Sequence, residues 1–339
     1  MATAEHVPES MEVDDLLLSL LDNMIWPILV LMSLAVWLVV PRTFTNLRSI
    51  EFILHGSVGL GFVALAEAVC LVSGNFDLSV GSIAGFSAML AGLVVSANKW
   101  NLISDPLLGV AVILAIGLVV GTTNGVMVGK VGINPFLQTL AFLIILQGAK
   151  LTLSTITITG LPDGYTRIGN APEISVGLLF ATFALLGFVM KYTPFGQAVY
   201  AVGSDDEAAR AVGIDTDRVV IAVYAISGVL SAAGGLMLTG FINVVPPTIG
   251  DELVFPAFAA AVIGGVSLYG GRGKVTGALG GVLLLGLIQA ALNVSGTPPE
   301  QVTLVNGLVL LAAILVYSSR RRLRERILSR QVEPRDYGQ

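Results

Sequence analysis

Between two apolar runs of membrane-spanning length lies the polar stretch Gly203-Ser204-Asp205-Asp206-Glu207-Ala208-Ala209-Arg210-Ala211-Val212-Gly213-Ile214, preceded by Tyr192-Thr193-Pro194-Phe195-Gly196-Gln197-Ala198. Ser204 and Glu207 have the spacing of a helix capping box, and three acids occupy the first turn, where the helix dipole favours them. Glycines bracket the stretch, which predicts a short helix of about ten residues. A capped, charged helix between membrane spans is either an ordinary solvated loop or a docking element. We call residues 192–216 the polar segment.

The composition is that of an integral membrane protein. Hydrophobic residues make up 55% of the 339 residues and charged residues 12%, and the mean hydropathy is +0.86. Soluble domains carry about 25% charged residues. Apolar runs of about 20 residues, the length that crosses a hydrocarbon core of about 30 Å, recur along the whole chain. The sequence therefore predicts an all-α polytopic membrane protein.

We predict about ten transmembrane helices, with nine or eleven as alternatives because the third and eighth are interrupted by Gly, Ser and Pro. The predicted spans are 22–41, 51–73, 80–97, 106–129, 134–154, 173–191, 217–242, 252–270, 274–293 and 301–317. They form one transmembrane domain over residues 22–318. An acidic arm (1–21) precedes it and a basic tail (319–339) follows it. The arm contains acids but no Lys or Arg, unlike a cleavable signal peptide.

The basic residues predict the orientation. An even number of spans puts both termini on one side. Placing the tail in the cytoplasm leaves 13 of the 18 Lys and Arg residues there, since five lie at or near the outer face. Those five are Arg42, Arg48, Lys99, Lys150 and Arg167. This asymmetry is the positive-inside pattern. We therefore expect cytoplasmic termini and a cytoplasmic polar segment, with the basic tail either touching anionic lipid or acting as a stop-transfer anchor.

Few groups in the chain suit catalysis or metal binding. Cys70 is the only cysteine, so no intramolecular disulfide can form. No cluster of His, Cys and carboxylates has metal-ligand spacing, and no Ser/His/Asp set lies at one membrane depth. The run Gly270-Gly271-Arg272-Gly273-Lys274-Val275 lacks the four-residue spacer of a phosphate loop and the Ser or Thr after Lys. If the protein is a pump, its energy comes from another subunit.

Polar groups inside predicted spans are costly and usually face a cavity or a partner. Glu67 lies deep in the second span without an oppositely charged neighbour in the sequence. Asn124, Gln138 and Gln147 add amides to the fourth and fifth spans. Hydrogen bonds between helices explain the amides equally well.

A break is predicted between the second and third spans, at Ser73-Gly74-Asn75-Phe76-Asp77-Leu78-Ser79. Backbone leaves the helix at membrane depth only where protein or a watery cavity satisfies it. The candidates for lining a substrate pathway are Glu67, Asn75, Phe76, Asp77 and Gln138. Phe76 either stacks on a ligand ring or packs as a plug. Asp77 either lines the pathway or caps the third span through the amides of Ser79 and Val80.

Glycines recur at every fourth position in two predicted spans. Gly273, Gly277 and Gly281 do so in the ninth span, and Gly81 and Gly85 in the third. Small residues at this spacing let helix backbones approach closely. The pattern indicates either tight packing within one bundle or a sliding surface between subunits or states.

Three blocks of the sequence resemble the ribose-type permease subunits of ABC importers. They are Phe76-Asp77-Leu78-Ser79-Val80-Gly81-Ser82, the polar stretch from Gly203 through Glu207-Ala208-Ala209 to Gly213-Ile214, and Ala259-Ala260-Ala261-Val262-Ile263-Gly264-Gly265-Val266-Ser267-Leu268-Tyr269-Gly270-Gly271-Arg272-Gly273. Asn124-Gly125, Pro135-Phe136 and Thr139-Leu140 are also similar to the family. The likeness runs from about residue 50 to residue 317, nearly the whole membrane part.

The resemblance implies a cobalamin-permease-like (type II) importer fold in a prokaryotic plasma membrane. It also implies two permease chains, two ATPase subunits that hold Mg-ATP, and an extracellular substrate-binding protein. This chain would then be no enzyme, with no cofactor of its own and no nucleic-acid partner. The coupling helix seated on the ATPase would be residues 204–211, and the candidate coupling residues are Ser204, Asp205, Asp206, Glu207, Ala208, Ala209, Arg210 and Gly213.

Three departures from the family pattern cluster around the expected pathway. Asn75-Phe76 stands where Gly-Ile is commoner, Glu67 where the family often has a neutral residue, and Phe255-Pro256-Ala257-Phe258 where ribose permeases often have Leu-Asp-Ala-Ile. The carried molecule therefore stays open among a pentose, a hexose, a furanose form, a signalling sugar and a nucleoside. A proton-coupled secondary transporter using Glu67 is a further alternative, although it needs no cytoplasmic docking helix.

Overall fold

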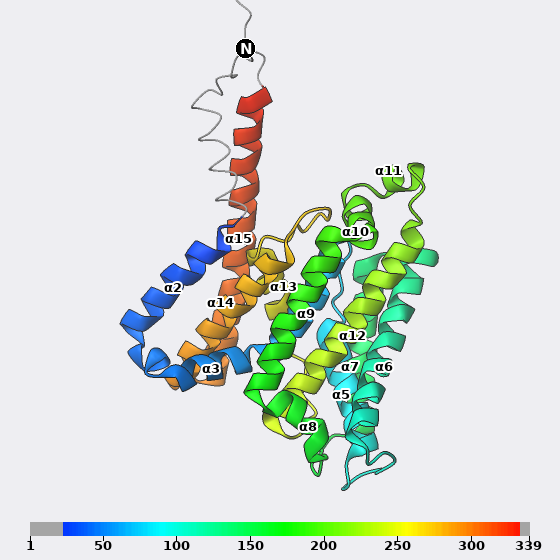
Figure 1. Ribbon diagram of the computed structural model, residues 1–339, viewed down its shortest axis with the longest axis vertical. Helices are drawn as coiled ribbons and strands as arrows, with labels where there is room; N and C mark the ends of the chain where they lie inside the picture. Colours follow the sequence, from blue (N-terminus) through cyan, green and yellow to red (C-terminus); the bar gives the residue numbers. More distant parts are fainter. Residues whose placement is uncertain (1–22, 333–339) are drawn as a thin grey trace, which may run out of the picture.

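The computed structural model describes residues 23–332, which fold into a bundle of helices (Figure 1). Within that range the chain forms no strand, and one isolated β-bridge pairs Ile158 with Val245. The predicted acidic arm (1–21) and residues 333–339 of the predicted tail lie outside the described residues. The elements are α2 (Ile25–Val39), η1 (Pro41–Phe44), α3 (Leu47–Gly56), α4 (Val58–Val72), α5 (Val80–Val95), α6 (Pro106–Gly125), η2 (Val126–Lys130, a π-helix), α7 (Pro135–Leu153), α8 (Asp163–Asn170), α9 (Pro172–Tyr192), α10 (Pro194–Ser204), α11 (Asp206–Ala211), α12 (Thr216–Ile242), α13 (Val254–Ile263), α14 (Val275–Val294) and α15 (Pro299–Val332).

Between residues 23 and 332, six helices are long and apolar enough to cross a membrane, namely α6 with η2, α7, α9, α12, α14 and α15. The bent pair α3 and α4 is a seventh candidate. The shorter apolar helices α2, α5 and α13 coincide with the remaining predicted spans 22–41, 80–97 and 252–270. Two of these, α5 and α13, are the predicted spans interrupted by Gly, Ser and Pro. All ten predicted segments therefore contain helix, while six or seven qualify as spans by length and composition.

The predicted second span (51–73) is two helices and not one. α3 and α4 meet at Ser57 with a bend of 44°. The Ser57 hydroxyl donates a hydrogen bond to the main-chain oxygen of Ile53 at 2.7 Å. Serine bonds to a carbonyl four residues back are known to bend helices, which gives the bend a local cause.

The central helix of the bundle is α12, which packs against α4, α5, α6 and α8. Its N-terminus is capped by Asp215, whose carboxylate accepts from the Arg218 amide, and it ends at Asn243 in the left-handed conformation. Gly117 and Gly121 of α6 lie directly against the main chain of α12. A Cβ at Gly121 would collide with the main-chain oxygen of Tyr224. The close approach of α6 and α12 therefore depends on the absence of side chains.

The predicted glycine stripes also make contacts inside this chain. Gly281 of α14 lies against the main-chain oxygen of Ala260 in α13. One turn away, Gly277 lies against the main-chain oxygen of Gly264, the C-cap residue of α13. Gly85 of α5 lies against the main-chain oxygen of Ile249. These contacts confirm the packing interpretation of the stripes.

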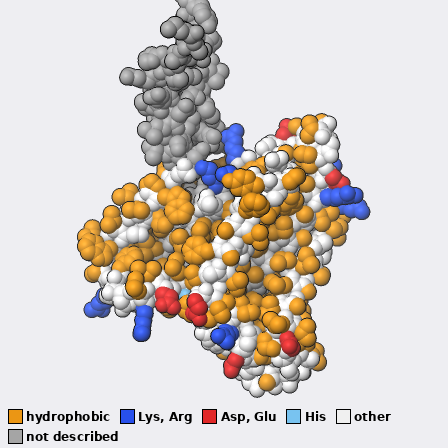
Figure 2. All heavy atoms as spheres, in the orientation of Figure 1, with side chains coloured by type: hydrophobic (Ala, Val, Ile, Leu, Met, Phe, Trp, Pro, Cys, Tyr) orange, Lys and Arg blue, Asp and Glu red, His pale blue; other side chains and the backbone are white. Residues whose placement is uncertain are grey.

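The face of the molecule drawn in Figure 2 has an apolar middle and charged ends. Hydrophobic side chains cover most of the face shown in Figure 2, while the charged side chains gather towards its two ends. We call the end that carries α10 and α11 the α11 end, and the opposite one the α8 end (Figure 1). The sequence interpretation missed α8, a short helix whose Tyr165 is fully buried. The distribution is that of a protein embedded in a bilayer.

Candidate functional site

The polar segment forms two helices at the α11 end, where one was predicted. Pro194 occupies the first turn of α10, and the Thr193 hydroxyl accepts from the amide of Gly196 at 3.3 Å. The helix α10 that begins there continues to Ser204. The Ser204 hydroxyl donates a hydrogen bond to the main-chain oxygen of Tyr200 at 2.8 Å. Ser204 therefore ends a helix instead of beginning one, and the predicted capping box with Glu207 is wrong.

Asp205 caps the second helix, α11. Its backbone is extended (φ −165°, ψ 106°), and its carboxylate accepts from the amide of Ala208 at 2.9 Å. Aspartate is as good an N-cap as serine, and Asp206 and Glu207 in the first turn suit the helix dipole. Gly213, with φ +89°, lies just past the end of α11. The predicted helix of about ten residues thus has six in the structure.

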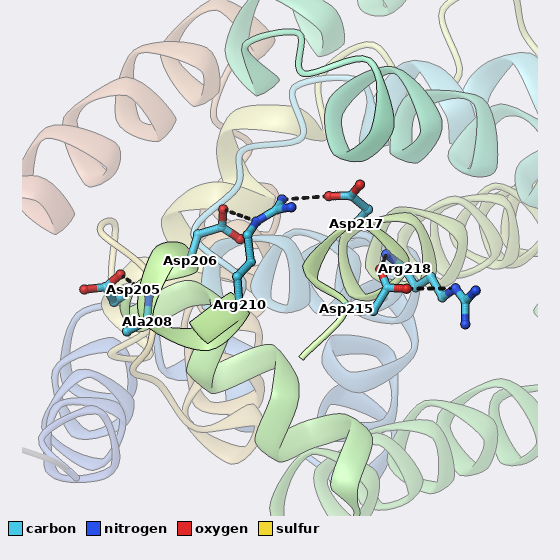
Figure 3. A network of polar contacts seen from close by, with 7 residues as sticks. All are labelled: Asp205, Asp206, Ala208, Arg210, Asp215, Asp217 and Arg218. Carbon is cyan, nitrogen blue, oxygen red and sulfur yellow. Dashed lines mark hydrogen bonds and ion pairs between the residues drawn. The ribbon is translucent and has the colours of Figure 1, made fainter. Parts of the chain in front are cut away.

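An arginine joins α11 to the start of α12 (Figure 3). The Arg210 guanidinium donates to Asp217 at 2.7 Å and to Asp206 at 3.1 Å. These two hydrogen bonds raise the pKa of Arg210, and the bond to Asp217 has the larger effect. All three side chains are well exposed, so the pairs add little stability. Their effect is geometric, because they hold α11 and α12 in one orientation. A second pair, Arg218 with Asp215, lies within the first turn of α12 (Figure 3).

The face of α11 that points away from the bundle offers a small, mixed surface. Glu207, Ala208 and Ala211 are exposed, and Val212 exposes 77% of its surface. Ala209 on the opposite side is buried in the hydrophobic core. Exposed small and apolar residues at the tip of a charged segment are suited to protein contact.

A cavity of about 400 Å³ lies between the polar segment and the helix break, which we define as residues 73–79. Asn75 of the break, Asp205 and Arg210 of the polar segment, and Tyr269 of the loop after α13 all line it. Four of the coupling candidates therefore share one hollow at the α11 end with the pathway candidate Asn75; they are Ser204, Asp205, Asp206 and Arg210.

Asp77 lies at the centre of a buried polar network. One carboxylate oxygen accepts from the amide of Ser79 at 3.0 Å and from its hydroxyl, and the other accepts from the Ser227 hydroxyl at 2.8 Å. Ser79 also accepts from the Asn124 amide at 2.9 Å, and Asn124 accepts from Gln138 at 3.3 Å. The network joins α5, α6, α7 and α12. The predicted bond to the Ser79 amide is confirmed.

The amide of Val80 bonds the main-chain oxygen of Asp77 at 3.4 Å and not its carboxylate, so that half of the capping prediction is wrong. The Ser79 and Ser227 hydroxyls were missed because an isolated serine in an apolar run gives no sequence signal for its partner. The arrangement fits the structural alternative for Asp77, since both of its oxygens are satisfied.

Phe76 and Asn75 flank this network. The rings of Phe76 and Phe258 stack with centroids 5.9 Å apart, and the Tyr224 hydroxyl of α12 donates to the main-chain oxygen of Phe76 at 2.7 Å. The contact with Phe258 fits the packing interpretation of Phe76, and it brings two departures from the family pattern together. The Asn75 amide donates to the main-chain and hydroxyl oxygens of Ser73.

Glu67 is the pathway candidate that the structure leaves without a hydrogen bond. It lies on α4 with only 1% of its surface exposed, and neither carboxyl oxygen has a hydrogen-bond partner within residues 23–332. The carboxylate and the main-chain amide of Asp77 both act on Glu67 electrostatically. The structure therefore places Glu67 beside the Asp77 network but not in it.

Lys150, one of the five basic residues expected at or near the outer face, is a buried structural cation. Its ammonium donates to the main-chain oxygen of Ile249 at 2.9 Å and pairs with the Asp251 carboxylate. The side chain of Lys150 is 1% exposed and that of Asp251 is 32% exposed. This pair ties α7 to the loop before α13.

Apolar helices of spanning length, with an exposed polar segment at one end, define a multi-pass membrane protein. Comparison with known proteins gives the family. Residues 49–314 match the family described as branched-chain amino acid transport system / permease component, and the chain belongs to it. No solved structure matches the chain.

The chain is similar to curated permeases for sugars. It is 33% identical to the ribose import permease protein of Bacillus subtilis (strain 168) over 265 residues, 76% of this chain and 80% of the relative. It is 31% identical to the fructose import permease protein of Rhizobium meliloti over 302 residues, 85% of this chain and 83% of the relative. The L-arabinose transport system permease protein of Escherichia coli (strain K12) is 32% identical over 281 residues, covering 80% and 82%.

Proposed function

We propose that this chain is the membrane-spanning permease subunit of an ABC importer for a monosaccharide. An extracellular binding protein delivers the sugar, and a separate ATPase subunit, which holds Mg-ATP, drives alternating access. Membership of the permease family and the similarity to ribose, fructose and arabinose permeases support the substrate class. The observation that carries the energy coupling is the capped, exposed helix α11, fixed to α12 through Arg210.

The proposal includes an assembly and an orientation. Ten spans in a cobalamin-permease-like fold pair with a second permease chain, identical or paralogous, in a prokaryotic plasma membrane. Both termini and the α11 end face the cytoplasm. The positive-inside pattern supports this orientation, because the basic residues gather on the side of the tail. The exposed apolar side chains of α7 suit contact with lipid or with the second chain.

The substrate pathway runs past the helix break in this proposal, with Glu67, Asn75, Phe76, Asp77 and Gln138 as its candidate residues. The shared cavity supports the place of Asn75, since it reaches from the break to the polar segment. A nucleoside or a sugar-like signalling molecule is the alternative cargo for the same machinery.

One observation favours a second candidate function, proton-coupled secondary transport. Glu67 is buried without a hydrogen-bond partner, as expected of a carboxyl group that takes up and releases a proton during transport. This alternative leaves α11 unexplained, because a secondary transporter needs no ATPase at its cytoplasmic end. The two candidates therefore differ in whether an ATPase binds α11.

The test changes the docking face without touching the core. Ala208 is exposed, whereas Ala209 is buried, so Ala208→Arg adds bulk and charge where the ATPase would sit. We expect this variant to insert into the membrane and to lose sugar uptake, because the helix no longer fits its groove. Uptake of labelled ribose, fructose and arabinose in proteoliposomes with the ATPase and binding protein measures this.

Ala208→Ser is the matched control, because it keeps a small side chain at the same position. It should transport at the wild-type rate. Normal uptake by Ala208→Arg removes the assignment of α11. Uptake by the wild type that needs a proton gradient and no ATPase would support the secondary transporter.

A further inference from the structure

Three segments far apart in the sequence meet backbone to backbone at the α11 end. They are the end of α4 with the start of the helix break, the end of α10, and the loop between α13 and α14, which reaches the polar segment (Figure 1). The four glycines in contact there are Gly74, Gly203, Gly270 and Gly271. We call these four residues the glycine junction.

Gly203 lies at the centre of the glycine junction. A Cβ on Gly203 would collide with the main-chain oxygen of Val72, would lie 2.6 Å from the amide nitrogen of Gly271, and would lie 3.0 Å from the carbonyl carbon of Ser73. All three contacts are to backbone, which cannot move aside as a flexible side chain can. The end of α10 therefore rests directly on the end of α4.

The loop after α13 closes the contact from the other side. Gly270 and Gly271 have φ of +81° and +65°, a conformation that favours glycine. A Cβ on Gly270 would lie 2.7 Å from the Cα of Gly74. The amide of Gly271 donates to the main-chain oxygen of Val72 at 2.8 Å, so the loop is bonded to α4 as well as packed against it.

One side chain adds a further link. The Tyr200 hydroxyl of α10 donates to the main-chain oxygen of Gly273 at 2.7 Å. Burial raises the pKa of this phenol, which therefore stays a neutral donor. α10 is thus held to the loop at both Tyr200 and Gly203.

We propose that the glycine junction transmits the movement of the polar segment to the helix break, with Gly203 and Tyr200 as positioning residues for transport. This inference rests on the proposed function and concerns the step after the ATPase has bound. A displacement of α10 and α11 has to shift the backbone of residues 72–74, because no side chain that could change rotamer lies between them. Closely packed interiors transmit strain in this way.

The helix break is a suitable receiver of this movement. It begins at the glycine junction and ends in the Asp77 network, which joins α5, α6, α7 and α12. Arg210 gives α11 a second route to the same place, because α12 carries Tyr224 and Ser227 to the break. Both routes lead from the docking face to the pathway candidates.

The experiment compares Gly203→Ala with Gly177→Ala in the assembled complex of permease, ATPase and binding protein in nanodiscs. Gly177 lies in helix α9, and a Cβ added there would meet no neighbouring helix or side chain within 4 Å. It therefore controls for adding a methyl group to a helical glycine. Gly203→Ala should bind the ATPase and lose sugar-stimulated turnover roughly ten-fold, while Gly177→Ala should stay within about two-fold of the wild type.

A second measurement separates transmission from mere packing. Hydrogen exchange of the amides of residues 73–79 should change when Mg-ATP is added to the wild-type complex and to Gly177→Ala. The same amides in Gly203→Ala should not respond, although the ATPase is bound. An equal response in both variants would overturn the proposal, as would wild-type turnover in Gly203→Ala.

Tyr200→Phe keeps the proposal testable if Gly203→Ala does not assemble. It removes only the hydroxyl that bonds Gly273, and we expect a smaller loss of turnover, about two- to five-fold, with a weaker exchange response. Wild-type turnover together with a wild-type exchange response in Tyr200→Phe would then refute the proposal. If the wild-type permease binds no ATPase, the proposed function itself is wrong. This binding is measured before any variant is compared.

Discussion

Lys150 and Asp251 form a buried ion pair, and removing Asp251 should destabilise the fold more than removing Lys150. Removing one partner of a fully buried ion pair costs about 3–5 kcal/mol, because the other charge stays buried and unpaired. Asp251→Asn leaves the Lys150 ammonium, 1% exposed, with the carbonyl of Ile249 as its remaining strong partner. Because Asp251 is 32% exposed and water reaches it, we expect a cost below the range for a fully buried pair, about 2–3 kcal/mol.

Substituting the other partner, Lys150, should lower the free energy of unfolding by less. Lys150→Met removes the buried charge and fills a similar volume, and Asp251 can turn to solvent. The remaining loss is the hydrogen bond to the carbonyl of Ile249, about 1 kcal/mol. The double variant should resemble Lys150→Met, because the side chain at position 251 would then face no buried charge. The expected coupling energy between the two positions is therefore about 2–3 kcal/mol in magnitude, equal to the cost of Asp251→Asn alone.

Equilibrium unfolding of the purified chain by SDS in mixed micelles, followed by circular dichroism, measures the four free energies of the cycle. The expected order is wild type, then Lys150→Met and the double variant together, then Asp251→Asn as the least stable. If Lys150→Met is as destabilising as Asp251→Asn, the buried-charge reasoning is refuted. A coupling energy near zero would show that the pair does not hold α7 to the loop before α13.

Two further predictions concern the proposed pathway and the polar segment. Glu67→Gln keeps the shape of the side chain and removes its charge, so it should fold and assemble normally but change transport rate, substrate preference or the pH profile of uptake. If it carries every tested sugar with the wild-type rate and pH profile, Glu67 is only a buried structural group. Arg210→Gln releases α11 from Asp217 at an exposed site. It should leave the unfolding free energy unchanged and reduce ATP-driven uptake, and uptake equal to that of the wild type would show that this ion pair plays no part in coupling.

The sequence predicted the helical segments well, because runs of about 20 apolar residues have one stable solution in a bilayer. Every predicted span contains helix in the structure. The details failed where local hydrogen bonds compete. Ser57 bends the second span through its bond to Ile53. This bend does not change the hydropathy profile on which the prediction rests.

The candidate site was predicted in part. The residues of the polar segment were identified, but the capping residue was not. Ser204 and Asp205 are both good N-caps, and the choice between them depends on where the preceding helix ends. Thr193-Pro194 begins α10 early enough to include Ser204. The pathway candidates Asp77 and Gln138 proved to share a network, yet their partner Ser227 lies 150 residues from Asp77 and carries no signal in the sequence.

The glycine junction shows most clearly why a sequence alone leaves coupling undetermined. The chain has 39 glycines, and a glycine that is needed for close approach looks the same in sequence as one that faces open space, such as Gly177. Gly203 and Gly270 lie in two of the sequence blocks that resemble the permease family, and Gly74 lies two residues before the third. Folding brings these blocks to one point, so that the polar segment, the loop after α13 and the helix break meet backbone to backbone. In the proposed mechanism this contact lets three separate motifs serve one transport step, because their main chains pack together at Gly203 with no side chain between them.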